Sequence, residues 1–134
     1  MGEGKFVVAA TTPEEVLDWG RLRWMSHPPA TGAEQLTVID VTLSPGKGHD
    51  FHKHPDQEEV IYVTGGTVEQ WVGQEKRLLG PGDAAFIPPG VVHASFNAGT
   101  SEAHVVAILG PCIGVNGYVS VEVAGEAPWK DLRK

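Results

Sequence analysis

The sequence lacks paired cysteines and long apolar runs. Its 134 residues include one cysteine, Cys112, which excludes an internal disulfide and any zinc site built on paired cysteines. Apolar runs such as Val105–Leu109 are far shorter than the ~20 residues that a transmembrane helix needs, and no signal peptide can be recognised near residue 1. We therefore expect a cytoplasmic protein with no membrane partner.

Basic residues are also few. The chain has 10 Lys and Arg against 17 Asp and Glu, which gives a formal net charge of −7 at pH 7. Proteins that bind nucleic acids or anionic membranes present clusters of Lys and Arg, and this chain has no such cluster. The charge balance therefore excludes nucleic acid as a partner, and it carries no information about a small-molecule ligand.

Turn-forming residues are abundant, with 17 glycines and 10 prolines. They separate eight short segments rich in Val, Ile and aromatic residues, and this spacing is typical of a β-sandwich or barrel. The predicted strands are Leu36–Leu43, Glu59–Val63, Thr67–Val72, Arg77–Leu79, Ala84–Ile87, Val92–Phe96, His104–Leu109 and Tyr118–Val123. No linker divides the chain, so we predict a single all-β domain over residues 1–134.

The first third of the chain differs from the rest. Thr12 and Glu15 form a capping-box pattern around Pro13, which predicts a short helix that ends at Gly20. We divide the domain into a helical or extended N-terminal segment (1–35), a barrel (36–123) and a C-terminal tail (124–134).

Two large apolar side chains, Trp19 and Trp24, fall in this N-terminal segment. They are expected either to cover one end of the core or to form a contact in a homodimer, because aromatic residues are enriched in interface cores. The sequence leaves both alternatives open.

A group of imidazoles and carboxylates points to a metal site. His52 and His54 are two residues apart and would share one face of a strand. Pro55 favours a turn, so that Glu59 can begin the neighbouring strand, and His93 lies beside a later turn. Two imidazoles, a carboxylate and a third imidazole are a suitable ligand set for a divalent transition metal.

These residues fall in two motifs that resemble a known family. Gly46-x5-His52-x-His54-x4-Glu59-x6-Gly66 resembles the first cupin motif, and Gly82-x5-Pro88-x-Gly90-x2-His93-x3-Asn97 resembles the second. The resemblance implies a double-stranded β-helix, which is a jelly-roll-like barrel. It also implies that His52, His54, Glu59 and His93 bind one divalent metal inside the barrel, and that Asn97 has a structural role.

The identity of the metal stays open, because three imidazoles and one carboxylate suit Fe, Mn, Ni, Cu, Co or Zn. Glu58 adjoins Glu59 and is a competing ligand, but the motif register favours Glu59. His49 lies in a glycine-rich stretch and is expected to be exposed. Cys112 is expected to be a small buried residue.

Aromatic residues offer candidates for a ligand pocket. His104 is expected to belong to the barrel wall, where it could line a pocket together with other ring-bearing residues of the predicted strands. Those residues are Tyr62, Trp71, Phe86 and Phe96. Strand parity alone does not say which of them face inward.

The resemblance implies two classes of function. The first is a metal-dependent enzyme that acts on a small molecule, with a dioxygenase of the quercetin or acireductone type as the favoured reaction and an isomerase, lyase or decarboxylase as alternatives. In an enzyme, Glu59 is a candidate proton acceptor as well as a ligand. The second class is a non-catalytic module that binds or senses a small molecule and holds a structural metal. Fold resemblance alone does not choose between them.

Overall fold

The computed structural model describes residues 2–133, and within them the chain is built mostly from short β-strands. The strands are β1 (Glu15–Leu17), β2 (Gly20–Ser26), β3 (Thr37–Leu43), β4 (Gly48–Lys53), β5 (Glu58–Gly65), β6 (Val68–Val72), β7 (Glu75–Leu79), β8 (Ala84–Ile87), β9 (His93–Asn97), β10 (Ala103–Gly110) and β11 (Val121–Glu122). One-turn helix α1 (Pro28–Thr31) and two 3-10 helices, Ala9–Thr11 and Trp129–Asp131, complete the elements.

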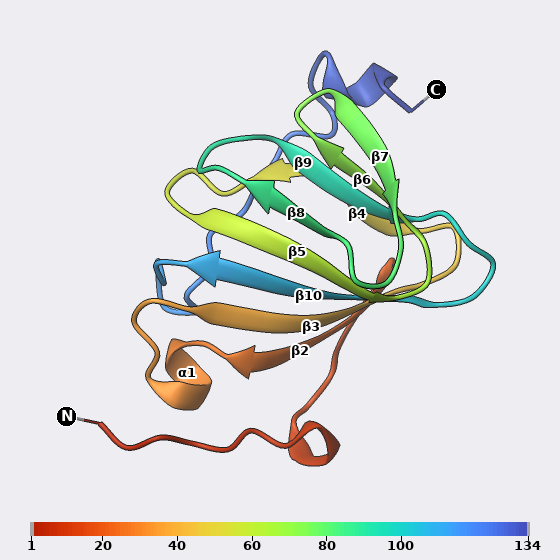
Figure 1. The fold of residues 1–134 in the computed structure, drawn as a ribbon. Helices are drawn as coiled ribbons and strands as arrows, with labels where there is room; N and C mark the ends of the chain where they lie inside the picture. Colours follow the sequence, from red (N-terminus) through yellow and green to blue (C-terminus); the bar gives the residue numbers. More distant parts are fainter. Residues whose placement is uncertain (1, 134) are drawn as a thin grey trace.

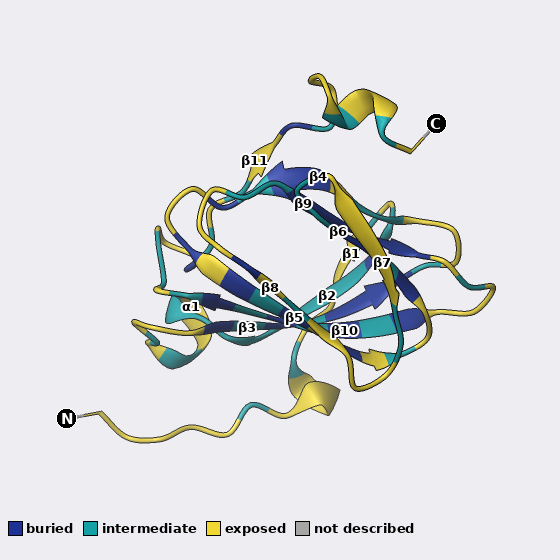
Figure 2. Cartoon of the chain, turned by 45° about the horizontal axis from the view of Figure 1, so that its top comes forward, coloured by how far each residue is buried: buried dark blue, intermediate teal, exposed yellow. Residues whose placement is uncertain are grey.

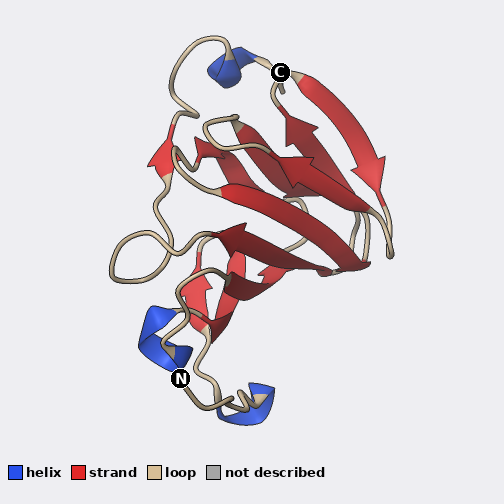
Figure 3. Cartoon of the chain, turned by 60° about the vertical axis from the view of Figure 1, so that its left-hand side comes forward, coloured by secondary structure: helices blue, strands red, loops and turns tan. Residues whose placement is uncertain are grey.

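The strands form two antiparallel sheets that face each other (Figure 1). The first sheet has the order β1-β2-β3-β10-β5-β8, and the second has the order β11-β4-β9-β6-β7. Neighbours in each sheet are often distant in sequence, as in the pairing of β10 with both β3 and β5. This arrangement, drawn in red in Figure 3, confirms the predicted all-β jelly-roll class.

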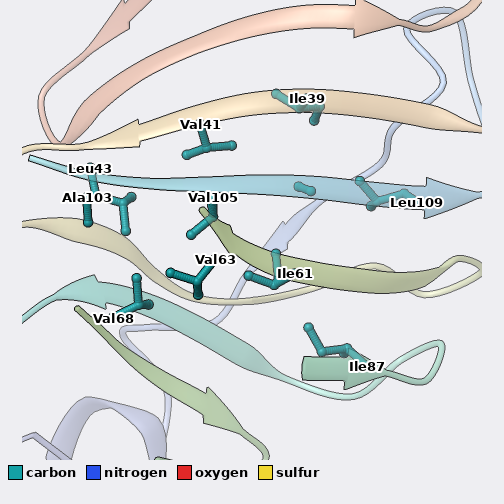
Figure 4. Packing of buried hydrophobic residues seen from close by; sticks show 11 residues of the cluster. Ile39, Val41, Leu43, Ile61, Val63, Val68, Ile87, Ala103, Val105 and Leu109 are labelled. Atoms are coloured by element: carbon teal, nitrogen blue, oxygen red, sulfur yellow. The ribbon is translucent and has the colours of Figure 1, made fainter. Parts of the chain in front are cut away.

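The main apolar core lies between the sheets. The alternation of side chains along each strand produces this core. Along the whole of β10, for example, buried and half-buried residues alternate, as expected for a strand with one face toward a core. Branched side chains from both sheets meet there, as Figure 4 shows for Val63, Val68 and Val105. In Figure 2 the buried residues, drawn in dark blue, lie on strands of both sheets, whereas the edge strand β7 is mostly exposed.

A second apolar cluster lies on the other face of the β4-β9-β6 sheet. It consists of Phe51, Trp71, Ala94, Phe96 and Val123. The 3-10 helix Trp129–Asp131 packs over it, with the Trp129 ring 5.6 Å from that of Phe51 between centroids. The C-terminal tail therefore covers the outer side of this sheet, as its place above β4 and β9 in Figure 1 indicates.

The predicted helix over residues 13–20 is wrong. Residues Glu15–Leu17 form β1, which pairs with β2 in a hairpin at the edge of the first sheet. A helix of about two turns is marginal on its own, whereas the hairpin gives the acidic residues of the capping pattern tertiary partners. Glu14 pairs with Arg21 at 3.0 Å, and Glu15 accepts a hydrogen bond from the indole of Trp24 at 3.0 Å.

The other strand predictions differ from the structure mainly at their ends. The predicted strand Tyr118–Val123 shrinks to β11, and β4 was missing from the predicted set although the histidine spacing implied a strand there. The turn at Gly66 requires glycine, because its φ is +77° and a Cβ would lie 2.8 Å from the Cα of Ala103. No helix in residues 2–133 has the length and apolar character of a membrane span.

Candidate metal centre and its cavity

The structure brings the four predicted ligand residues together. His52 lies on β4, His54 directly follows it, Glu59 lies on β5 and His93 lies on β9. Their candidate ligand atoms all lie within 4.8 Å of one another. All four residues are buried, with exposures between 1% and 4%. Antiparallel pairing positions them, since His52 is directly opposite His93 in the β4–β9 ladder.

Each imidazole of this metal cluster (His52, His54, Glu59 and His93) is oriented by a backbone carbonyl. The Nδ1 atoms of His52, His54 and His93 lie 2.7, 2.8 and 3.0 Å from the carbonyl oxygens of Asp50, Val119 and Val91, respectively. A carbonyl oxygen only accepts hydrogen bonds, so the ring proton of each histidine sits on Nδ1. The three Nε2 atoms are left as free lone pairs, and such outer partners are typical of metal-binding histidines.

The free lone pairs point toward a negatively charged oxygen. Nε2 of His54 and Nε2 of His93 lie 3.2 and 2.8 Å from Oε1 of Glu59. None of these three buried atoms has a hydrogen-bond partner among the described residues. Two buried acceptors this close together need a proton or a metal cation between them. The donor set therefore fits a divalent transition metal.

The protonation of the metal cluster follows from the same contacts. Burial, reinforced by the nearby imidazoles of His49 and His93, holds the pKa of His52 well below its ordinary value. Burial also acts to lower the pKa of His54, but the Glu59 carboxylate outweighs it, so this pKa is raised. For Glu59, burial would raise the pKa, but His54 and His93 outweigh it and lower the pKa to about 2. Glu59 is thus anionic at neutral pH.

A cavity of about 290 Å³ opens beside the metal cluster. Its walls are apolar and aromatic along β2, β3 and β5, and polar near β4 and β11. The lining residues are Glu15, Leu17, Trp19, Leu22, Trp24, Ile39, Val41, His49, His52, Glu59, Ile61, His93, Ser95, Ala107, Tyr118, Ser120 and Glu122. A small molecule in this cavity would lie against the metal cluster.

The expectation that His49 is simply exposed is wrong. Its ring stacks on that of His52 with 3.6 Å between centroids, and its Nε2 lies 3.1 Å from Oε1 of Glu122. The two histidines are three residues apart and would face opposite sides of a regular strand. The β4–β9 register shifts between them, and this irregularity turns both rings toward the cavity. The sequence offered no signal for the shift.

The predicted pocket aromatics are also wrong. Tyr62 and Phe86 are exposed, while Trp71 and Phe96 belong to the second apolar cluster. The wall of the cavity comes instead from the N-terminal segment, where Trp19 and Trp24 face inward, and from Tyr118. The two tryptophans thus cover one end of the core, and a homodimer stays a prediction.

The remaining candidates divide between confirmed and corrected roles. Glu58 is exposed, in keeping with the choice of Glu59. Asn97 is buried and its side-chain amide donates to the carbonyls of Leu43 and Ser101, which confirms a structural role. His104 lies outside the metal cluster, with Nδ1 3.2 Å from the hydroxyl of Thr42.

Two further residues bear on the loop beyond β10. Cys112 is only partly buried, so its predicted burial is wrong in degree. Sequence reasoning did not single out Gln57, which is 1% exposed. Its amide nitrogen donates to the carbonyls of Pro111 and Gly117, and its oxygen accepts from the backbone N–H of Val119. Gln57 thus holds the loop that carries the carbonyl partner of His54.

Known proteins share this fold and part of this sequence. Protein SchB of Streptomyces halstedii is 34% identical over 92 residues, which cover 69% of this chain and 67% of SchB. Polyketide synthase CurC of Streptomyces cyaneus is 32% identical over 92 residues, 69% of this chain and 60% of CurC. The solved structure of KdgF from Halomonas sp. superposes with a TM-score of 0.73 at 22% identity, over 81% of this chain and 94% of KdgF, and shows the shared fold.

The family comparison covers the strands that carry the metal cluster. The family model described as the cupin domain matches residues 39–109. This range includes both motifs noted in the sequence and all four residues of the cluster. The chain belongs to the cupin domain family.

Proposed function

We propose that this protein is a metal-dependent enzyme that acts on a small molecule bound in the cavity, with an oxygenase as the first candidate reaction. The observation that carries the proposal is the convergence of three imidazoles and the Glu59 carboxylate, all buried, beside that cavity. A divalent metal held by His52, His54, Glu59 and His93 would supply Lewis acidity and coordination positions for substrate oxygens.

The surrounding residues have distinct roles in this proposal. The carbonyls of Asp50, Val91 and Val119 fix the orientation of the three imidazoles. Apolar side chains such as Ile61 and Leu22 line the cavity, and exclusion of water by a bound molecule would strengthen the electrostatic interactions there. Glu59 is anionic at neutral pH and lies 2.8 Å from Nε2 of His93, so it is the candidate proton acceptor of the metal cluster as well as one of its ligands.

The Streptomyces relatives bear on the choice of substrate. The name of CurC places it with a polyketide synthase, and polyketide intermediates carry carbonyl and hydroxyl oxygens on adjacent or alternate carbons. Two such oxygens are the arrangement that would bind a metal through both atoms. Catechols, flavonols and β-diketones are therefore the classes to be tested first. The chain spans about two thirds of SchB and 60% of CurC, so their activities enter only as this proposal.

Metal content tests the first part of the proposal. Protein purified without added metal should contain about one transition-metal atom per chain, and His52→Ala and His93→Ala should each abolish this content. His104→Ala is the matched control, because His104 lies outside the metal cluster. A wild-type chain that holds no metal, even after anaerobic loading with Fe(II) or Mn(II), would contradict the proposal.

Oxygen consumption tests the reaction. The Fe(II)- or Mn(II)-loaded protein should consume O₂ with at least one member of a panel of catechols, flavonols and β-diketones, and His93→Ala should not. Tight binding of a panel member without oxygen uptake or any product would instead support the non-catalytic binding module that the family resemblance also implies.

A further inference from the structure

Two chains of aromatic rings run from the metal cluster along the cavity. In the first, His49 stacks on His52, and Trp19 stacks on His49 with 4.9 Å between centroids and 10° between planes. In the second, Tyr118 lies 4.9 Å from His54, and Trp24 meets Tyr118 edge-on at 5.5 Å. The outer members of both chains line the cavity. Such walls favour planar ligands, because aromatic rings attract one another by stacked and edge-to-face contacts.

The charged side chains that line the cavity are acidic. Its lining, as far as residues 2–133 define it, includes the carboxylates of Glu15, Glu59 and Glu122 and no Lys or Arg. The two arginines of β2, Arg21 and Arg23, pair with carboxylates away from the cavity. Proteins recognise carboxylate, phosphate and sulfonate groups chiefly through such cations. Away from the metal, an anionic ligand would find no Lys or Arg among these lining residues and would meet the carboxylates of Glu15 and Glu122 instead.

The volume of the cavity limits the size of the ligand. A volume of about 290 Å³ compares with the roughly 150 Å³ of an engineered protein cavity that holds one benzene molecule. One or two fused rings fill the available space. Glu122, with 61% of its side chain exposed, places its charge at the solvent end of the cavity, 3.1 Å from the His49 ring.

We propose that the cavity selects uncharged planar molecules of one or two aromatic rings with adjacent hydroxyl groups, and that Glu122 disfavours anionic ones. The part about the hydroxyl groups rests on the proposed function, since these groups would reach the metal. The parts about aromatic rings and charge rest on the side chains that line the cavity, so they do not depend on a bound metal.

A matched ligand pair tests the inference. 2,3-Dihydroxynaphthalene and its 6-sulfonate share the same two hydroxyl groups and differ by one sulfonate group, which carries one negative charge; the Glu122 variant below separates the effect of this charge from that of the added volume. Binding is measured by calorimetry and by quenching of tryptophan fluorescence, with the protein loaded with Zn²⁺, which has no redox chemistry of its own. We expect the neutral ligand to bind at least about tenfold more tightly than the sulfonate at low ionic strength.

Charge reversal at Glu122 tests its role. Glu122→Lys should remove most of the preference for the neutral ligand, because the exposed side chain tolerates the change and now attracts the sulfonate. Glu126→Lys is the matched control, since it alters the net charge equally at an exposed position outside the cavity lining. It should keep the wild-type preference.

Each failure has a separate meaning. Equal affinity for the two ligands in the wild type, or an unchanged preference in Glu122→Lys, would overturn the charge selection. Zinc-loaded protein that binds neither ligand would overturn the aromatic specificity while leaving metal binding intact. A chain that takes up no zinc would contradict the proposed function, and in that case the metal-free protein must still prefer the neutral ligand if the inference about the walls is correct.

Discussion

At the scale of single residues, the metal cluster depends on backbone carbonyls as much as on its own side chains. Two of the carbonyl partners, those of Asp50 and Val91, lie two residues before the histidine that they orient. The third, that of Val119, lies 65 residues after His54. The orientation of His54 therefore depends on a distant loop, and Gln57 is the residue that holds this loop in place.

Replacement of Gln57 tests this dependence. Gln57→Leu removes the donor to the Pro111 carbonyl and the acceptor of the Val119 N–H, whereas the Gly117 carbonyl keeps the Thr37 hydroxyl as a donor. We therefore expect a loss of about 2 kcal/mol in the free energy of unfolding. Because His54 also loses its fixed orientation, metal affinity should fall by about 10- to 100-fold. Urea unfolding of the metal-free protein and competitive titration with a zinc chelator measure the two effects.

Asn97→Ala provides the comparison for that variant. Asn97 is also a buried amide that bonds backbone groups, but none of these groups orients the metal cluster. It should cost similar stability and leave metal affinity unchanged. Equal losses of metal affinity in the two variants, or no loss in Gln57→Leu, would show that the loop does not position His54.

At the scale of elements, the sequence predicted what depends on local pattern. The motif spacing identified the four residues of the metal cluster, and the Val- and Ile-rich segments between turn-forming residues identified β3, β5 and β10. The capping pattern near Thr12 predicted a helix that does not form. In the β1–β2 hairpin, Glu14 instead pairs with Arg21 and Arg23, and Glu15 accepts a hydrogen bond from the indole of Trp24. His49 was missed because a register shift, which depends on the partner strand β9, reverses its face.

The walls of the cavity could not be read from the sequence for a related reason. Trp19 and Trp24 enter through β1 and β2, which add to the edge of the first sheet beside β3. Nothing in their local sequence states which sheet they join. Parity combined with the motif, which places His93 inside the barrel, could have excluded Phe96, since the two residues are three apart on β9 and face opposite sides.

The C-terminal tail is an element whose role can be tested directly. Trp129 contributes the largest ring that covers the outer face of the β4-β9-β6 sheet, where it packs on Phe51. Trp129→Ala should lower the free energy of unfolding by about 2 kcal/mol, since the ring is only partly buried and its removal uncovers apolar surface. Chemical denaturation monitored by circular dichroism measures the change.

Two observations complete this test. Trp129→Phe should restore most of the lost stability, because it returns an aromatic ring to the same position. The metal content of Trp129→Ala should stay at the wild-type level, since the metal cluster lies on the inner face of the sheet. Wild-type stability in Trp129→Ala would mean that the tail does not support the sheet.

At the scale of the whole molecule, the metal cluster joins the two sheets. His52 and His93 belong to the five-stranded sheet, whereas Glu59 belongs to the six-stranded sheet. A metal bound by these residues would connect the sheets at the inner end of the cavity. The connection exists only in the folded chain, so metal binding and folding are coupled.

This coupling predicts a large thermal response to metal. Zinc at about 100 times its dissociation constant should stabilise the folded state by about 2.7 kcal/mol, which corresponds to a rise of about 10 °C in Tm for a domain of this size. Proton uptake by His54, whose pKa is raised by Glu59, competes with the metal, so the rise should shrink as the pH falls below neutrality. Thermal unfolding with and without zinc, at several pH values, measures both effects. His52→Ala should show no response, and His104→Ala should respond like the wild type. An unchanged Tm in the wild type, or an equal rise in His52→Ala, would show that zinc does not join the sheets at this cluster.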